Sequence, residues 1–291
     1  MVQSGNDGAI AIAEHLMGSE AAFVNLMNEA ALLAARRNKQ KIGLPELEDA
    51  VERVIAGPEK KNRRISPYEQ RLVAYHESGH TLVAGLLAHT DPIHKVSIVP
   101  RGRAGGYTLM LPERDTSYIQ KNKLLDDVKT LLGGRIAESL ILEEISTGAT
   151  NDLERASKII RKMITEYGMS ESIGPMYLAG DKEVFLGRDY GHTQNFSDEL
   201  AANIDSEAKR ILTEAMYTAQ AIISERMDIL RNMIAALLER EKLNGEEFRK
   251  ILGGESLPPL ATGAKRDEGD HSGQRHERNM DLHAGEGPQE V

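Results

Sequence analysis

Two histidines and a glutamate have the residue types and the spacing that metal-dependent hydrolysis requires. His76, Glu77 and His80 form an HExxH pattern. On a helix, residues four positions apart lie on the same face, so both imidazoles can bind one metal ion. Imidazole nitrogens suit zinc, which in catalytic sites keeps one coordination position open for water. A glutamate beside the first histidine can accept a proton from that water as it attacks a peptide carbonyl. The pattern predicts the centre of a metalloprotease.

The alternative interpretation is a chance HExxH on a solvated helix face, and the neighbouring residues argue against it. Residues 66–69 read Ser-Pro-Tyr-Glu, a capping box with proline at the first helical position. The stripe that holds both histidines also holds Val73, Val83 and Leu87, so the imidazoles are predicted to face the interior. Buried histidines beside a glutamate need a polar partner, and a metal ion is such a partner.

The composition limits the class of protein. The chain has 291 residues, of which 40% are hydrophobic and 28% charged, as in soluble globular proteins of one large or two small domains. A net charge of -9 argues against a nucleic-acid surface. Cysteine is absent, which excludes disulfides and thiolate metal sites and suits a reducing compartment. The sequence shows neither a membrane span nor a signal peptide, so the chain by itself is expected to be soluble and cytoplasmic.

Helical periodicity dominates the chain, and the expected fold is mainly α with a small β element. Residues 94–100 alternate weakly and are rich in valine and isoleucine, which predicts a strand, and residues 107–111 are predicted to pair back against it. A glycine-rich loop over residues 174–196 could border a cleft. The expected organisation has five parts: an unassigned segment 1–19, a helical module 20–58, a charged linker 59–65, a helical domain 66–253 that carries HExxH, and a disordered tail 254–291.

Residues 116–142 form a long helical pattern that contains two adjacent glycines, Gly133 and Gly134. Each glycine costs roughly 1 kcal/mol relative to alanine in a helix, so we expect another backbone to pack closely there. Glu138 lies on the same helix. Either it accepts a hydrogen bond from a metal-binding histidine and orients that ring, or it is an exposed carboxylate or an ordinary ion-pair partner.

Two further residues are candidate ligands by type. Asp152 follows Asn151 in the first turn of a predicted helix, where the helix dipole keeps a carboxylate ionised. It is either a partner of that dipole or a third, oxygen ligand of the metal, and the spacing alone leaves both interpretations open. His94 lies outside the HExxH helix and has no spaced partner, so it is not expected to bind the metal.

Several segments together resemble one family, the FtsH-type ATP-dependent zinc metalloproteases, which are membrane-anchored AAA proteases of bacteria and organelles. They cover roughly residues 20 to 252 and read VNLMNEAALLAARRNK, VIAGPEKKNRRIS, VAYHESGHTLVA, DPIHKVSIVPRGRAGGYT, LLGGRIAE, STGATNDLERA and EYGMSESIGP. The resemblance implies that His76, His80 and Asp152 hold zinc, that Glu77 is the catalytic glutamate, and that Glu138 has a supporting role. It also implies that strand 94–100 is the edge to which an unfolded substrate adds as a β-strand.

The resemblance further implies one Zn²⁺ per chain, unfolded polypeptide substrates, a homo-hexamer, and a place at the cytoplasmic side of the bacterial membrane through an N-terminal anchor. Residues 20–58 then correspond to the last helices of the ATPase lid. The sequence contains no GxxxxGK[ST] motif, so ATP and Mg²⁺ are expected only in an ATPase module that the family has and this sequence lacks. Nucleic acid is not an expected partner.

A rival hypothesis assumes the same fold without peptide-bond hydrolysis. The chain would then be a non-catalytic FtsH-like remnant that binds partners through its helices. The presence of His76, Glu77, His80 and Asp152 together argues for a zinc-dependent endopeptidase instead.

Overall fold

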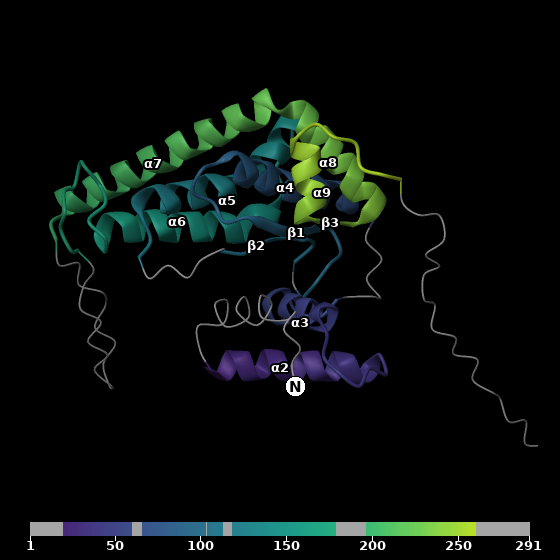
Figure 1. Cartoon of the computed structure of the whole chain (residues 1–291). Coiled ribbons are helices and arrows are strands. Elements are labelled where there is room, and N and C mark those ends of the chain that lie inside the picture. The colour runs from purple at the N-terminus through teal and green to yellow at the C-terminus, as the bar shows by residue number, and fades with distance from the viewer. Residues whose placement is uncertain (1–19, 60–65, 103, 113–117, 179–195, 260–291) are drawn as a thin grey trace, which may run out of the picture. The chain divides into compact units, whose positions relative to one another are not determined.

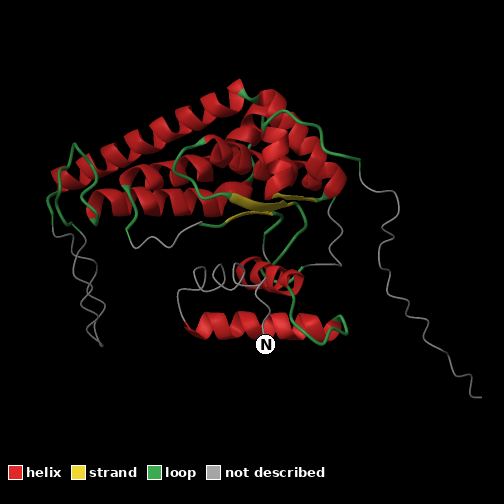
Figure 2. Ribbon diagram, viewed as in Figure 1, coloured by secondary structure: helices red, strands yellow, loops and turns green. Residues whose placement is uncertain are grey.

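The computed structural model describes residues 20–59, 66–102, 104–112, 118–178 and 196–259. Within these ranges the chain consists mainly of helices, with one three-stranded sheet (Figures 1 and 2). The predicted class, mainly α with a small β element, is confirmed. The segment 1–19, most of the linker and most of the predicted tail lie outside the described residues. No helix among the described residues combines the length and the apolar character that crossing a bilayer requires.

The N-terminal helices α2 (Glu20–Arg36) and α3 (Leu44–Ala56) pack against each other around a small hydrophobic cluster of their own. Pro45 lies in the first turn of α3, and Gly57, with a φ of 86°, ends it. Only glycine adopts such a φ without strain, which explains the helix end. The cluster is formed by Leu26, Ala30, Leu47, Ala50 and Val51.

Helix α4 (Pro67–Leu86) carries the HExxH pattern and begins as the sequence predicts. The Ser66 hydroxyl accepts a hydrogen bond from the backbone N–H of Glu69 at 3.2 Å, and the Glu69 carboxylate accepts one from the backbone N–H of Ser66 at 3.1 Å. This capping box satisfies N–H groups that a helix start otherwise leaves unpaired. The start of α4, and with it the position of the histidines along the helix, is therefore set locally.

Helix α5 (Lys121–Leu142) crosses α4 with backbone against backbone. A Cβ atom on Gly133 would lie 2.6 Å from the carbonyl oxygen of Gly79, and a Cβ on Gly79 would clash with the carbonyl of Gly133. The predicted close approach at the glycine pair is thus confirmed. Because α4 and α5 touch here, residues of α5 come within reach of the histidines.

The sheet has the order β2-β1-β3, and both pairings are antiparallel. Strands β1 (Ile93–Ser97) and β2 (Tyr107–Met110) confirm the two predicted strands. The expectation that the first strand is the sheet edge is wrong, because β3 (Lys242–Asn244) covers its other side. A strand of three residues is too short to show a periodicity, so the sequence gives no sign of it. The edge that adjoins the HExxH helix is β2, whose Thr108 contacts Glu77.

The remaining helices complete the main core. After the 3₁₀ turn η1 (Thr147–Ala149) come α6 (Thr150–Thr165), α7 (Asp198–Glu225), α8 (Met227–Arg240) and α9 (Gly245–Leu252). Helix α7 packs along α5 and α6, α8 packs on α4, and α4 also contacts β1. In Figure 1, α7 and the sheet lie on opposite sides of α5. The HExxH helix is therefore held between other helices and the sheet.

Candidate metal centre

Three helices bring the candidate residues together. Helix α4 supplies His76, Glu77 and His80. Helix α5, which touches α4 at the glycine crossing, supplies Glu138, and the first turn of α6 supplies Asp152. His80 and Glu77 are buried, while His76 and Asp152 are partly buried. Polar groups that are withdrawn from water in this way must satisfy one another or bind a ligand.

Three potential ligand atoms converge on one point. The Nε2 atoms of His76 and His80 are 2.9 Å apart, and Asp152 Oδ2 lies 3.2 Å from the first and 3.4 Å from the second. Zinc ligands about 2.0–2.2 Å from the ion in a tetrahedral site lie roughly 3.3–3.5 Å from one another. The triangle thus has the size of a zinc site within a few tenths of an ångström. Among the described residues, this is the one group of three His, Asp or Glu side chains that is arranged to hold a metal ion.

The outer nitrogens of both rings are already in use, and this fixes what the inner nitrogens present. His76 Nδ1 lies 2.6 Å from Glu138 Oε1, and His80 Nδ1 lies 2.8 Å from the backbone carbonyl oxygen of Thr130. Because carboxylates and carbonyls only accept, each Nδ1 is the donor. A neutral ring then carries a lone pair on Nε2. Two such lone pairs and a carboxylate oxygen that point at one place are the donor set of a metal cation, so the residues present fit zinc.

The electrostatics of the site favour positive charge at this place. Burial lowers the pKa of His76, but the hydrogen bonds to Asp152 and Glu138 outweigh burial and raise that pKa to about 10. Burial raises the pKa of Asp152, but the interactions with the two histidines lower it by more than burial raises it. The pKa of this carboxyl therefore lies below its usual range. A site that holds a proton this strongly also stabilises a divalent cation in the proton's place.

Glu77 lies beside this triangle and points its carboxylate toward the sheet. Thr108 of β2 donates its hydroxyl to Glu77 Oε2 at 2.8 Å. Burial raises the pKa of Glu77, while His80, His76 and the Thr108 hydroxyl act in the opposite direction. A raised pKa brings a carboxylate closer to the range in which it exchanges protons near neutral pH. The sequence does not reveal Thr108 as a partner of Glu77, because Thr108 lies on a strand 31 positions away and belongs to no motif.

Glu138 is buried, so its interpretation as an exposed carboxylate is wrong. One oxygen faces His76 Nδ1, and the other accepts the backbone N–H of Ser146 at 2.9 Å. Burial raises the pKa of Glu138, but His76 and Ser146 outweigh it and keep the pKa below its usual value. An ionised, doubly bound carboxylate of this kind can hold the imidazole of His76 in one orientation.

The two adjacent glycines of α5 have different roles. Gly133 meets the backbone of α4, as predicted for the pair. Gly134 faces the imidazoles instead: a Cβ there would lie 2.6 Å from His80 Nε2 and 2.7 Å from His76 Cε1. Any larger residue would press on the nitrogen that faces the convergence point. The two glycines in the sequence predict a close approach at this place. That Gly134 approaches the imidazoles follows only from the packing of α4 against α5.

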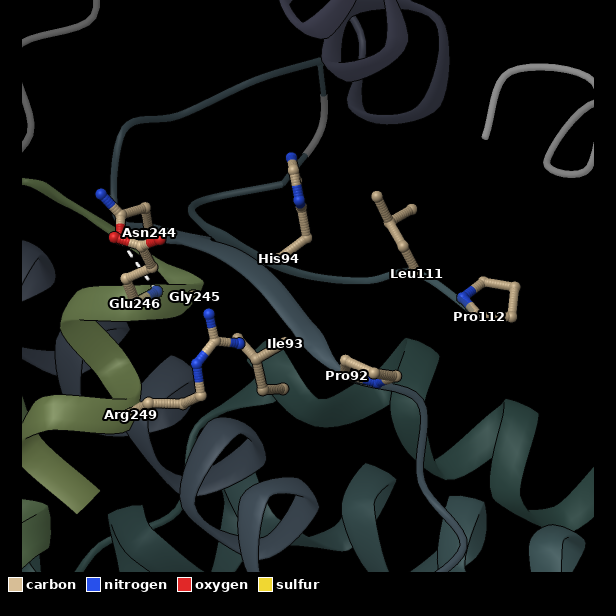
Figure 3. A pocket seen from close by; sticks show the side chains of 9 residues that line it. All are labelled: Pro92, Ile93, His94, Leu111, Pro112, Asn244, Gly245, Glu246 and Arg249. Carbon is tan, nitrogen blue, oxygen red and sulfur yellow. Dashed lines mark hydrogen bonds between the residues drawn. The ribbon is translucent and has the colours of Figure 1, made fainter. Parts of the chain in front are cut away.

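His94 lies outside the metal triangle. It lines a hollow of about 420 Å³ between the ends of β1 and β2 and the start of α9 (Figure 3). None of the residues of the metal triangle lines this hollow. Its other lining residues are Pro92, Ile93, Leu111, Pro112, Asn244, Gly245, Glu246 and Arg249. Most of the predicted loop 174–196 lies outside the described residues, so its relation to the site stays a prediction.

Comparison with known proteins agrees with this geometry. The model of peptidase family M41 matches residues 63–251, which is more than half of the chain, so the chain belongs to this family. The predicted resemblance to FtsH-type zinc metalloproteases is confirmed by its relatives. A protein of Thermoanaerobacter sp. (strain X514) named ATP-dependent zinc metalloprotease FtsH 1 is 58% identical over 234 residues, or 80% of this chain and 38% of the relative. These findings place the chain in a family of peptidases, and its named relatives are zinc metalloproteases.

Two further relatives bear the same kind of name. The FtsH of Caldicellulosiruptor bescii is 49% identical over 237 residues, 81% of this chain and 38% of the relative. FtsH 2 of Alkaliphilus metalliredigens is 51% identical over 232 residues, 79% of this chain and 34% of the relative. The chain thus spans little more than a third of the length of the relatives it matches. A second family model, D-alanyl-D-alanine carboxypeptidase, matches residues 1–40, far less than half of the chain.

Proposed function

We propose that this chain is a zinc-dependent endopeptidase that hydrolyses peptide bonds of unfolded polypeptides. The observation that carries the proposal is the convergence of His76 Nε2, His80 Nε2 and Asp152 Oδ2. Glu77 follows His76 on the same helix, and its carboxylate interacts electrostatically with all three residues. We assign the three converging residues as the ligands of one zinc ion per chain. Glu138 accepts the hydrogen bond of His76 Nδ1 and orients that ring, and Glu77 is the general base.

A bound zinc ion would supply Lewis-acid polarisation of the scissile carbonyl and a lowered pKa of the attacking water. The Glu77 carboxylate accepts the proton of this water during the attack and then passes it to the leaving amine nitrogen. Asp152 and the two histidines fix the place at which the carbonyl is polarised. The Nδ1 hydrogen bonds to Glu138 and to the Thr130 carbonyl keep both rings turned toward that place.

We propose that substrate binds along β2 in an extended form. The sheet order β2-β1-β3 leaves one side of β2 without a partner strand among the described strands. An extended peptide can pair with such an edge through backbone hydrogen bonds, whatever its sequence. Thr108 of the same strand contacts Glu77, so a peptide paired with β2 would pass close to the general base. This mode suits unfolded chains, because a folded protein does not offer a free extended segment.

For the whole protein we propose ATP-dependent proteolysis by a homo-hexamer. The names of the relatives carry the term ATP-dependent, and the chain covers only a little over a third of their length. In this proposal residues 20–58 are the end of an ATPase lid, and ATP and Mg²⁺ bind in an ATPase module outside this sequence. The resemblance to the family supports a place at the cytoplasmic side of the bacterial membrane. The M41 domain, residues 63–251, is then the proteolytic half.

The test is the Glu77→Gln variant assayed with fluorescently labelled casein, an unfolded substrate. The amide cannot accept the proton, so the hydrolysis rate should fall roughly 10²- to 10⁴-fold. Zinc content should stay the same, because the three proposed ligands remain. Wild-type activity in this variant would contradict the assignment of Glu77. An intact chain that neither binds zinc nor cleaves casein would favour the non-catalytic interaction remnant.

A further inference from the structure

We infer that Thr108 is a positioning residue that orients the general base, an inference that rests on the proposed function. Its Oγ1 donates to Glu77 Oε2 at 2.8 Å. Glu77 is 7% exposed, so water has little access to replace this hydrogen bond. A carboxylate that must act as a base needs one defined orientation, and a single well-placed donor can select it.

The hydrogen bond engages only one of the two carboxylate oxygens. Among the described residues, Thr108 is the side chain that donates to the Glu77 carboxylate, and it donates to Oε2. Oε1 is therefore left to accept a proton from a water molecule. Thr108 thus gives the two oxygens different roles. Oε2 is hydrogen-bonded to the sheet, and Oε1 accepts the proton of the water.

Thr108 is itself held in place on two sides. Its backbone lies in β2 opposite Val96 of the central strand. Its Oγ1 is 3.1 Å from the hydroxyl of the buried Thr81. Since Thr108 donates its proton to Glu77 Oε2, Thr81 is the donor across this contact and shares its one proton with the backbone carbonyl of Glu77 at 2.7 Å. The two threonines therefore connect α4 and β2 next to the base. A donor on a paired strand keeps its position better than one on a loop.

The strand also approaches the side chain of Glu77 closely. A Cβ atom on Gly106 would lie 2.9 Å from Glu77 Cγ and 2.7 Å from the carbonyl oxygen of Ser97. Glycine at position 106 lets the strand come near enough to α4 for Thr108 to reach the Glu77 carboxylate. Removal of the hydroxyl without a change of shape should leave the packing intact and free the carboxylate to rotate.

The experiment compares Thr108→Val, Thr108→Ser and Thr90→Val with the wild type and with Glu77→Gln. Valine has nearly the shape of threonine without the hydroxyl, and serine keeps the hydroxyl. Thr90 serves as the matched control, because its hydroxyl donates to backbone carbonyls at the end of α4, away from the metal triangle. The readouts are kcat and KM on a fluorogenic peptide, zinc content and the midpoint of thermal unfolding.

In Thr108→Val we expect kcat to fall roughly 10- to 100-fold, the range that a small misplacement of a catalytic group produces. KM, zinc content and the unfolding midpoint should remain close to the wild-type values. Thr108→Ser should restore most of kcat, and Thr90→Val should keep the wild-type kcat and KM. A merely structural role of Thr108 would lower the unfolding midpoint and would not be rescued by serine.

Three outcomes would overturn the inference. They are wild-type kcat in Thr108→Val, equal impairment in the valine and serine variants, and a change confined to KM. Each of these leaves the proposed function standing as long as Glu77→Gln is inactive and the wild type binds zinc. Activity in Glu77→Gln would instead refute the proposed function itself. The two failures are therefore distinguishable in one set of proteins.

Discussion

Helices α4 and α5 are bridged by two groups of histidine and carboxylate side chains, which differ in what their polar atoms face. In one group His76 and His80 meet Asp152 and Glu138. In the other, His89, just beyond α4, meets Asp126 of α5, with His89 Nδ1 and Asp126 Oδ2 3.0 Å apart. Asp126 also accepts the backbone N–H of His89 at 3.2 Å and the Lys129 ammonium at 2.7 Å.

The difference lies in charge balance and convergence. Lys129 offsets the charge of the buried Asp126 carboxylate, and the side chain of His89 is 45% exposed, so the polar atoms of this group already have partners or reach solvent. In the first group, Asp152 Oδ2 faces the Nε2 atoms of His76 and His80 themselves. Both rings use Nδ1 elsewhere and turn Nε2 inward. A histidine beside a carboxylate is thus common, whereas converging acceptor atoms indicate a metal site.

The largest expected contrast is between His80→Gln and His89→Gln. Loss of His80 removes a proposed ligand, so the rate of casein hydrolysis should fall by more than about 10³-fold. Such a loss is plausible in size, because enzymes accelerate their reactions roughly 10⁶-fold or more. His89→Gln should keep the wild-type rate within about twofold, because it changes only the contact of a half-exposed side chain with Asp126, outside the metal triangle. Comparable losses in both variants would remove the distinction between the two groups.

A smaller contrast is expected between Glu138→Gln and Asp126→Asn. The amide at position 138 is a weaker acceptor for His76 Nδ1–H, so zinc affinity should drop about 10- to 100-fold. Competition with a chromophoric chelator measures this affinity directly. Asp126→Asn serves as the control and should leave zinc affinity unchanged. An unchanged affinity in Glu138→Gln would show that Glu138 does not support the metal ligand.

The smallest effect concerns the pH dependence of stability in the second group. Burial raises the pKa of Asp126, but Lys129 and His89 outweigh burial and lower it. A lowered folded-state pKa means that the stabilisation is present above the unfolded pKa of about 3.9 and is lost as pH falls through the folded value. Asp126→Asn should therefore reduce the free energy of unfolding by about 1–3 kcal/mol at pH 7. In urea titrations the gap to the wild type should shrink below about pH 4, and a gap that is constant with pH would contradict this account.

The parts of the site that the sequence predicts are those with local signals. The capping box at Ser66 sets where α4 begins, and the four-residue spacing puts both histidines on one face. Gly133 marks a helix crossing because glycine within a helix has a cost. For Asp152 and Glu138, spacing leaves two interpretations each, because their partners lie 76 and 62 positions away. The resemblance to FtsH-type proteases implies that Asp152 is a ligand, and the fold shows the contact of Glu138 with His76.

The parts that could not be predicted depend on pairing between distant segments. Strand β3 has three residues, and only its pairing with β1 makes it a strand and leaves β2 as the edge. Thr108 looks like an ordinary strand residue until β2 is placed against α4. Gly134 reads like its neighbour Gly133 until the imidazoles behind it are known. In each case the role of the residue or strand depends on tertiary contacts, which local sequence patterns do not predict.

The most direct test of the central claim is the zinc content of the purified chain, measured by mass spectrometry in the wild type, in Asp152→Ala and in the control Asp126→Ala. If His76, His80 and Asp152 hold the metal, the wild type and Asp126→Ala should contain about one zinc ion per chain. Asp152→Ala should lose most of it. A wild-type chain without zinc, or an Asp152→Ala variant with the full amount, would contradict the claim.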